Sequence, residues 1–289
     1  MNIETTRSAI RDYLFSALAD NSKRDSQVLR ASNYMALNDF SGLYRPLLLL
    51  ATAKGYSVGV EQAMPIAAAI EFVYVASLIE DDIMDCSYTR RGKPSCHKVF
   101  GEPVAHLAHM LLREIAEENI TEKNKLSNSQ RIAIARRAFH TGKAMVYGQA
   151  RDVTQRGLDS VEGIVQMYEG KSGALIGAAL SSGGIIGGAC QEDIDVLDKI
   201  GLTMGVSYQI IDDALDARAS HEETGKPVKQ DGNKKTLLAL VGWDNVKQIR
   251  CEKDAEVDEL FATLHGDHSL LGDMIYHLRG KHDMYFAVT

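Results

Sequence analysis

The distribution of proline limits what this chain can fold into more than any other feature. The 289 residues include only Pro46, Pro65, Pro94, Pro103 and Pro227, so no proline falls between 104 and 226. A proline-free stretch of that length favours helices over a loop-rich β protein, because proline removes a backbone donor and ends or kinks helices. The alternation typical of strands is also scarce. The sequence therefore predicts an all-α protein.

Three segments carry the apolar spacing of helices. In 65–85 apolar residues cover nearly the whole circumference until an acidic end, which is typical of a helix buried in a large core. Segment 192–217 repeats this buried, acid-ended plan, and 128–155 has apolar residues at three- and four-residue spacing. We predict roughly ten or more helices in a single domain spanning 1–289, with no clear internal boundary.

Two local features refine this prediction. The most polar connector is 117–130, where Ser127 or Ser129 is expected to cap the following helix. Gly173 and Gly177 stand four residues apart, and we expect them to let two helices pack closely.

Composition excludes several classes of function. There are 32 Lys+Arg against 39 Asp+Glu, a net charge of −7, which argues against a broad nucleic-acid-binding face. The four cysteines are widely spaced, with no CxxC and no His–Cys ligand cluster, so we expect free thiols in a reducing compartment. The N-terminus lacks the apolar run of a signal peptide, and no stretch has the character of a membrane span. These features predict a cytoplasmic protein.

Two acidic clusters with the same DDxxD spacing end the buried helices, at 81–85 and 212–216. Positions i and i+4 of a helix share one face, so Asp81 and Asp85 project together, as do Asp212 and Asp216. Like charges at this spacing destabilise a helix modestly, so a sequence that carries them twice needs positive charge to offset them. Oxygen ligands without His or Cys indicate a hard cation, with Mg²⁺ first.

A simpler interpretation of each cluster is a solvated acidic helix end. That interpretation suits a single cluster, but two copies, each after an apolar helix, favour a paired site. Facing carboxylate patches bind Mg²⁺ poorly alone and well when a phosphate supplies the remaining oxygens.

Basic residues near both clusters favour such a phosphate ligand. Arg90 and Arg91 fall on a loop just beyond the first cluster, and guanidinium groups hold phosphates through paired hydrogen bonds. Lys171 and Ser172 stand at a glycine-loosened helix position. Further basic positions that could close over a diphosphate follow the second cluster: Lys226, Lys234 and Lys235. Taken singly, these features also read as an exposed turn, a helix kink and a solvated loop.

Together these motifs resemble those of the trans-isoprenyl diphosphate synthases, or polyprenyl synthetases. The likeness is carried, in order and spacing, by SLIEDDIMDCSYTRRGKPSCHKVFG, GKSGALIG, GVSYQIIDDALD and GKPVKQDGNKKTLLAL. Both DDxxD motifs with RRGxP form a highly specific combination, whereas KSG alone means little. The resemblance implies a single all-α domain whose helices surround a deep central cavity, usually as a homodimer. It also implies a prenyltransferase that condenses an allylic diphosphate with isopentenyl diphosphate and releases pyrophosphate.

The resemblance assigns roles to individual residues. The Mg²⁺ ions, three in the family's pattern, would bind with the diphosphate through Asp81, Asp85 and Asp212. The other catalytic positions would be Asp82, Asp213, Asp216 and Lys171. The allylic diphosphate would contact Arg90, Lys171, Ser172, Gln209 and Lys226, with Gln149 and Asp152 near the metals. The isopentenyl diphosphate would take Arg45 and Arg91.

The isopentenyl side departs from the family's pattern. Gly42 stands where the family usually has a lysine, Tyr74 replaces a common His or Gln, and Glu80 precedes the first cluster where an uncharged residue or His is common. This asymmetry motivates an alternative, a terpene cyclase or another enzyme that ionises an allylic diphosphate on the same scaffold. The retained Arg45 and Arg91 argue against it. A non-catalytic regulatory subunit is disfavoured because all six aspartates are present.

Small residues before the first cluster indicate a long product. At a rise of about 1.5 Å per residue, Ala76 lies about 7.5 Å and Val73 about 12 Å from Asp81 along the helix, with Ser77 beside the former. In short-chain members of the family bulky aromatics here stop the chain early. The resemblance therefore predicts geranylgeranyl diphosphate or a somewhat longer product, and we expect Ala76→Phe to shorten it.

Overall fold

The structure is a computed structural model that describes residues 2–20, 26–37, 41–218 and 234–283. Helices form nearly all of the regular structure within these ranges. The strands found there are β1 (Thr89–Arg90) and β2 (Lys93–Pro94), an antiparallel pair just after the first acidic cluster. The all-α prediction is confirmed.

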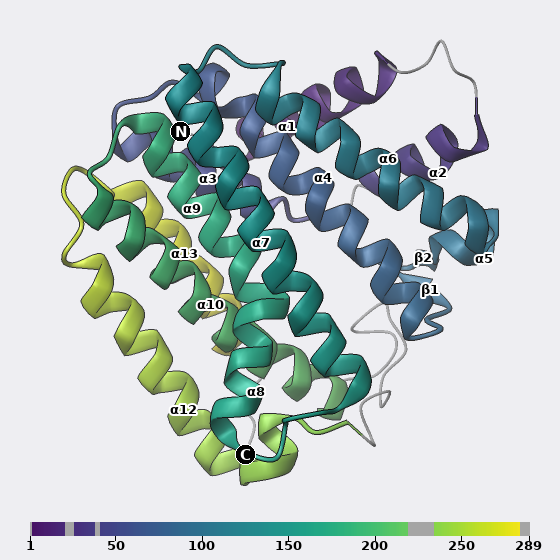
Figure 1. Cartoon of the computed structure of the whole chain (residues 1–289). Coiled ribbons are helices and arrows are strands. Elements are labelled where there is room, and N and C mark those ends of the chain that lie inside the picture. The colour runs from purple at the N-terminus through teal and green to yellow at the C-terminus, as the bar shows by residue number, and fades with distance from the viewer. Residues whose placement is uncertain (1, 21–25, 38–40, 219–233, 284–289) are drawn as a thin grey trace.

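Figure 1 shows the order of the helices along the chain. Those before the proline-free stretch and at its start are α1 (Ile3–Ala19), α2 (Gln27–Ala36), α3 (Tyr44–Gly55), α4 (Val60–Met84), α5 (Cys96–Phe100) and α6 (Glu102–Thr121). The later ones are α7 (Asn128–Thr154), α8 (Val161–Tyr168), the π-helical η1 (Glu169–Gly173), α9 (Ala174–Gly187), α10 (Gln191–Arg218), α12 (Leu237–Phe261) and α13 (Ser269–Asp283). The three segments predicted as helices, 65–85, 128–155 and 192–217, correspond to α4, α7 and α10.

Helix α4 lies at the centre of the fold, packed against α3 and α6 (Figure 1). Its length and composition alone would allow it to cross a membrane, but 78% of its most apolar stretch is buried inside the protein. That burial is the environment of a core helix, which agrees with its lack of a polar face. At its C-terminal end the chain emerges at the acidic cluster.

Helix α7 begins with a complete capping box. The Ser127 side chain accepts a hydrogen bond from the Gln130 backbone N–H, and the Gln130 side chain accepts one from the Ser127 N–H. These bonds satisfy donors that a helix start otherwise leaves open. Ser127 is therefore the cap, and the alternative, Ser129, lies inside the helix.

Glycines set the close packing of α9 and η1 against α10. An ideal Cβ placed on Gly201 would lie 2.2 Å from the Gly177 nitrogen, and one on Gly205 would lie 2.2 Å from the Gly173 Cα. The two backbones therefore meet without side chains between them. The expectation that Gly173 and Gly177 permit close helix packing is confirmed.

Gly201→Ala should destabilise the protein by about 1–3 kcal/mol, because the added methyl group meets backbone that cannot move aside. Urea unfolding followed by circular dichroism measures the change. The matched control is Gly280→Ala in α13, where nothing lies within 4 Å of the added carbon; it should leave stability unchanged or raise it by up to about 1 kcal/mol. Equal stability of the two variants would contradict the packing argument.

Candidate active site

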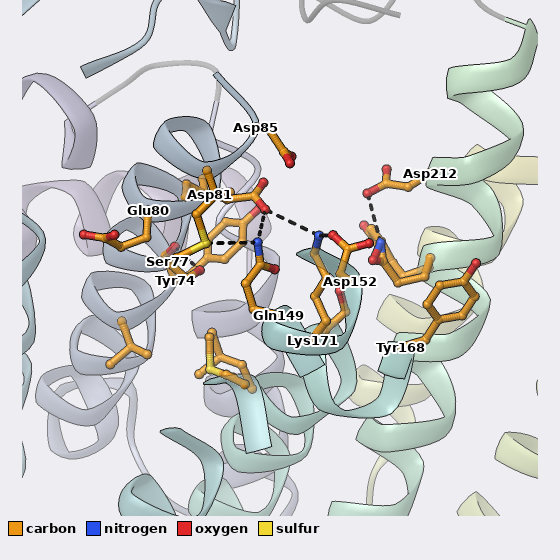
Figure 2. A pocket seen from close by; sticks show the side chains of 18 of the residues that line it. Tyr74, Ser77, Glu80, Asp81, Asp85, Gln149, Asp152, Tyr168, Lys171 and Asp212 are labelled. Atoms are coloured by element: carbon orange, nitrogen blue, oxygen red, sulfur yellow. Dashed lines mark hydrogen bonds and ion pairs between the residues drawn. The ribbon is translucent and has the colours of Figure 1, made fainter. Parts of the chain in front are cut away.

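The two acidic clusters line one cavity of about 1170 Å³. Figure 2 shows Asp81 and Asp85 on one side, from α4, and Asp212 on the other, from α10. The predicted site residues that line the cavity are Arg45, Val73, Ser77, Asp81, Asp85, Arg90, Arg91, Gln149, Lys171, Ser172, Gln209, Asp212, Asp213 and Asp216. Asp82 is fully buried beside it, and Lys226 lies outside the described residues.

Asp81 contacts three polar side chains of the site. Its Oδ1 accepts a hydrogen bond from Gln149 Nε2 at 2.9 Å and lies 3.4 Å from Lys171 Nζ (Figure 2). Its Oδ2 accepts a hydrogen bond from Arg90 Nη2 at 3.2 Å. Burial acts to raise the pKa of Asp81, but the charges of Lys171 and Arg90 and the bond from Gln149 outweigh it and hold the pKa at about 2. Asp81 is therefore an anion at any physiological pH.

Asp82 and Arg90 form a buried pair behind Asp81. Arg90 places Nη2 2.6 Å from Asp82 Oδ1 and donates a second bond from Nε at 2.8 Å. Burial raises the pKa of Asp82 to about 6, although Arg90 opposes the shift. The pair orients Arg90 so that its guanidinium also reaches Asp81. The hairpin turn directly after Arg90, between β1 and β2, has Arg91 and Gly92 at positive φ, 52° and 72°.

Lys171 is held at the centre of the cavity by a π-helical turn. The turn lies directly against α7, since an ideal Cβ on Gly148 would lie 2.3 Å from the Lys171 nitrogen. Lys171 Nζ lies 2.6 Å from Asp152 Oδ2. Burial acts to lower the pKa of Lys171, but Asp81 and Asp152 raise it above its ordinary value. Such π turns recur at functional sites, and here the turn aims a permanent cation between the two clusters.

Lys234 links the two sides of the cavity mouth. Its Nζ lies 3.3 Å from Asp85 Oδ1 and 3.4 Å from Asp152 Oδ2. The buried Asp152 carboxylate contacts both Lys171 and Lys234. The same two lysines contact Asp81 and Asp85 respectively. Lys234, one of the basic residues after the second cluster, therefore lies among the acidic residues, and its role over a diphosphate stays a prediction. Lys235 instead pairs with the exposed Asp159.

The second cluster is positioned by neighbouring side chains on α10 and α8. Gln209 Nε2 lies 3.5 Å from Asp212 Oδ2, and the Tyr168 hydroxyl donates a short hydrogen bond to Asp213 Oδ2. The same hydroxyl accepts one from the Leu237 N–H at 3.2 Å. Burial and the carboxylate of Asp213 raise the pKa of Tyr168 well above its ordinary value, so the phenol stays protonated. Tyr168 thereby ties the start of α12 to the acidic end of α10.

Arg45 and Arg91 converge on Tyr74 at another wall of the cavity. The Arg45 guanidinium lies 3.8 Å from the centre of the Tyr74 ring, and that of Arg91 lies 5.8 Å from it. Below them Glu71 is fully buried and accepts a hydrogen bond from the Ser41 hydroxyl at 2.9 Å. Burial raises the pKa of Glu71, while Arg91, Ser41 and Arg45 oppose the rise. The Tyr74 ring and the buried Glu71 carboxyl attract both guanidinium groups, and so they stabilise two like charges side by side.

The donor set fits Mg²⁺. Asp85, Asp212, Asp213 and Asp216 line the cavity together with Asp81, and all their ligand atoms are carboxylate oxygens. Asp82 Oδ2 is buried and has no hydrogen-bond partner among the described residues, so the acidic side of the site still has an acceptor to satisfy. Oxygen-only donors suit a small hard cation, and the lysines and arginines beside them suit an anionic ligand of that cation.

The sequence pattern described as polyprenyl synthetase matches residues 28–263, which include both clusters and the arginines of the site. The chain belongs to the polyprenyl synthetase family. The predicted family resemblance is thus confirmed.

Proteins similar to this chain include enzymes that are named for different products. The heterodimeric geranylgeranyl pyrophosphate synthase large subunit 2 of Arabidopsis thaliana is 36% identical over 222 residues, covering 73% of this chain and 59% of that protein. Farnesyl diphosphate synthase of Geobacillus stearothermophilus is 36% identical over 217 residues, covering 71% and 72%. The crystal structure of a Helicobacter pylori geranyltransferase, complexed with magnesium and isoprenyl diphosphate, is 25% identical with a TM-score of 0.81, covering 96% and 95%. The chain spans about three fifths of the length of the Arabidopsis relatives it matches.

The deeper cavity is lined by two of the three predicted product-length residues. Val73 and Ser77 line it, but Ala76 does not; Ala76 is buried elsewhere, and its carbonyl lies 3.0 Å from His109 Nδ1. The sequence-based prediction used the rise per residue along the helix, but it did not consider the direction in which each side chain points. Five residues turn a helix by about 500°, so Ala76 points about 140° away from Asp81, whereas Ser77 points about 40° away. The roles of Val73 and Ser77 stay predictions.

Several residues that shape the site give little signal in the sequence. Tyr168 precedes the KSG segment and looks like an ordinary core aromatic, and Glu71 is one polar position inside an apolar helix. Arg113 and His109 of α6 also line the cavity, far in sequence from every motif. A buried glutamate within an apolar stretch was a usable signal, because an uncompensated buried carboxylate is costly.

Proposed function

We propose that this synthetase is a magnesium-dependent trans-prenyltransferase that condenses an allylic diphosphate with isopentenyl diphosphate. The observation that carries the proposal is that one cavity holds two facing aspartate clusters and, beside them, a separate pair of arginines around Tyr74. An enzyme that only ionises an allylic diphosphate needs no second diphosphate site. The paired Arg45 and Arg91 supply one even though Gly42 replaces the family's usual lysine, so elongation is favoured over the cyclase alternative.

The residues divide the reaction between them. Asp81, Asp85 and Asp212 would hold Mg²⁺, which spreads the charge that develops on the leaving diphosphate. Arg90, Lys171, Ser172 and Gln209 bind the allylic diphosphate, and Arg45 and Arg91 bind the isopentenyl diphosphate. Three of the residues on the allylic side, Arg90, Lys171 and Gln149, are already fixed by hydrogen bonds or ion pairs, so little reorganisation accompanies binding.

The covalent changes follow from this arrangement. The allylic C–O bond breaks and its electron pair leaves with pyrophosphate. The double bond of isopentenyl diphosphate attacks the allylic C1 to form the new C–C bond, and a proton is lost to the released pyrophosphate. The apolar wall of the deeper cavity, which includes Leu78, Met145 and Leu175, excludes water that would otherwise capture the carbocation as an alcohol.

The proposal extends to assembly and location. Exposed apolar side chains follow the outer faces of α6 and α7, and a second copy of the chain would cover them: Leu107, Ile132 and Phe139. We therefore include a homodimer in the proposal. The four cysteines are free, which suits a reducing, cytoplasmic compartment.

The proposed main product is geranylgeranyl diphosphate, because the cavity face below Asp81 carries small side chains. Ser77→Phe should shorten the main product by at least one five-carbon unit, since the ring would fill space one helical turn from Asp81. Mass spectrometry of dephosphorylated products measures the lengths. Ser77→Ala is the control and should leave them unchanged. An unaltered product from Ser77→Phe would show that the chain grows along another wall.

The function is tested by giving the purified protein farnesyl diphosphate and Mg²⁺, with and without isopentenyl diphosphate. We expect a longer prenyl diphosphate only when both substrates are present. Hydrocarbon or alcohol formed without isopentenyl diphosphate would overturn elongation and favour a cyclase. Geranyl and dimethylallyl diphosphate are tested as starters in parallel, and failure with all three would contradict the proposal.

A further inference from the structure

We propose a second metal site, for Zn²⁺, about 30 Å along α10 from the second acidic cluster. Its ligands are Cys190, Asp193 and His265, whose side-chain donor atoms all lie within 4.8 Å of one another. Cys190 immediately precedes α10, whereas the second acidic cluster lies near the other end of that helix, about 21 residues later at 1.5 Å per residue. Figure 1 shows the α9–α10 corner and the α12–α13 connection at the same end of the bundle.

The geometry of the cluster suits three ligands of a tetrahedral ion. Asp193 Oδ1 and His265 Nδ1 are 2.9 Å apart. Zinc bonds of about 2.0–2.3 Å place tetrahedral ligand atoms about 3.3–3.8 Å apart, so adjustments of about 1 Å suffice. Cys190 and His265 are exposed and can make them by side-chain rotation, while Asp193 is fixed.

Charge balance provides an independent reason to expect a cation. The Asp193 carboxylate is only 3% exposed, and its described partners are hydrogen-bond donors rather than a lysine or arginine: the Tyr56 hydroxyl, and the backbone and ring nitrogens of His265. Buried carboxylates are ordinarily paired with a cation or bound to a metal. With a Cys190 thiolate and a neutral His265, the cluster would carry two negative charges, which one divalent ion neutralises.

The ligand types select the metal. A thiolate and an imidazole are softer than the oxygen donors of the catalytic cavity, and together with one carboxylate they suit Zn²⁺ rather than Mg²⁺. Tyr56 adds a feature common at zinc sites, because its hydroxyl donates to Asp193 Oδ2 at 2.8 Å and leaves Oδ1 toward the other two ligands. Water would complete the tetrahedron on the exposed side.

Binding of the ion would link segments of the fold that are far apart in the sequence. Tyr56 caps the C-terminus of α3, Cys190 and Asp193 begin α10, and His265 lies between α12 and α13. An ion held by the last two segments, with Tyr56 bonded to its carboxylate, clamps three elements that are far apart in the sequence. Because the ion would bind only the folded chain, it should raise thermal stability without taking part in the reaction.

The test uses Co²⁺ as a spectroscopic substitute for Zn²⁺ in the chelator-treated full-length protein, with excess Mg²⁺ to occupy the aspartate clusters. We expect one equivalent of Co²⁺ to give a sulfur-to-cobalt charge-transfer band. The band should disappear in Cys190→Ser, weaken at least tenfold in His265→Ala, and persist in the control variants Cys86→Ser, Cys251→Ser and His277→Ala. No thiolate band in the wild type, or a band that survives Cys190→Ser, overturns the proposal.

Zinc titration followed by thermal melting gives a second readout. One equivalent of Zn²⁺ in the presence of Mg²⁺ should raise the Tm of the wild type by about 3 °C or more, and of Cys190→Ser by less than half as much. An equal shift in both proteins overturns the site. Circular dichroism of Cys190→Ser without zinc confirms that the exposed substitution leaves the fold intact. The outcome is independent of prenyl transfer, which is measured separately.

Discussion

Asp81→Asn should lower kcat by about 10³-fold, the largest effect we expect from a single substitution. The loss corresponds to about 4 kcal/mol, the scale of removing one charge that acts on a developing transition state. Asp81 is the carboxylate on which Gln149, Lys171 and Arg90 converge, and its low pKa of about 2 keeps it ionised. Asparagine keeps the shape but not the charge. Steady-state kinetics with both diphosphates measures the loss.

The substitution should leave the fold intact, because both cations keep another partner. Arg90 remains paired with Asp82, and Lys171 with Asp152. Asp198→Asn is the matched control, since Asp198 forms an ion pair of 2.7 Å with Arg137 outside the cavity, and it should change kcat less than twofold. Titration with Mg²⁺ adds a diagnostic, because loss of a ligand should raise the concentration needed for half-maximal rate. A variant that retains a tenth of the wild-type kcat would contradict the role of Asp81.

Much of this site could be predicted from the sequence because helical geometry fixes local relations. A buried helix that ends in DDxxD must present its first and last aspartates on one face, and two such helices in one chain predict a shared site. The roles of Arg90 and Lys171 as neighbours of those carboxylates followed from motifs that stand close to them in the sequence. The structure brings both into direct contact with Asp81.

Relations set by tertiary packing were outside the reach of that reasoning. The bond from Tyr168 to Asp213 and the stacking of Arg45 on Tyr74 join residues that no short spacing connects. The position of Ala76 away from the cavity has a related cause, since the face of α4 that meets the cavity is decided by the helices packed around it. Spacing likewise gave no sign that Cys190 and His265 approach each other.

Arg113 of the deeper cavity is expected to limit the length of the product. It lines the cavity from α6, and an ideal Cβ on Gly142 would lie 3.6 Å from its Nη2. Gly142 is seven residues, about 10.5 Å along α7, from Gln149, which bonds to Asp81. No carboxylate among the described residues pairs with Arg113. A growing hydrocarbon chain therefore meets an uncompensated guanidinium about two helical turns below the reacting end.

Arg113→Leu should raise the ratio of longer to main product by about tenfold or more. Each buried CH₂ of the chain contributes about 0.8 kcal/mol, but only where it does not desolvate a charge, so replacing the guanidinium by leucine favours one further five-carbon addition. Product analysis by mass spectrometry at equal turnover measures the ratio. Arg113→Lys is the matched control, because it keeps the charge, and it should keep the wild-type distribution. An unchanged distribution in Arg113→Leu would remove Arg113 from the set of length determinants, while elongation by the wild type would stand. A longer product in both variants would indicate that side-chain size, rather than charge, limits the chain at this depth.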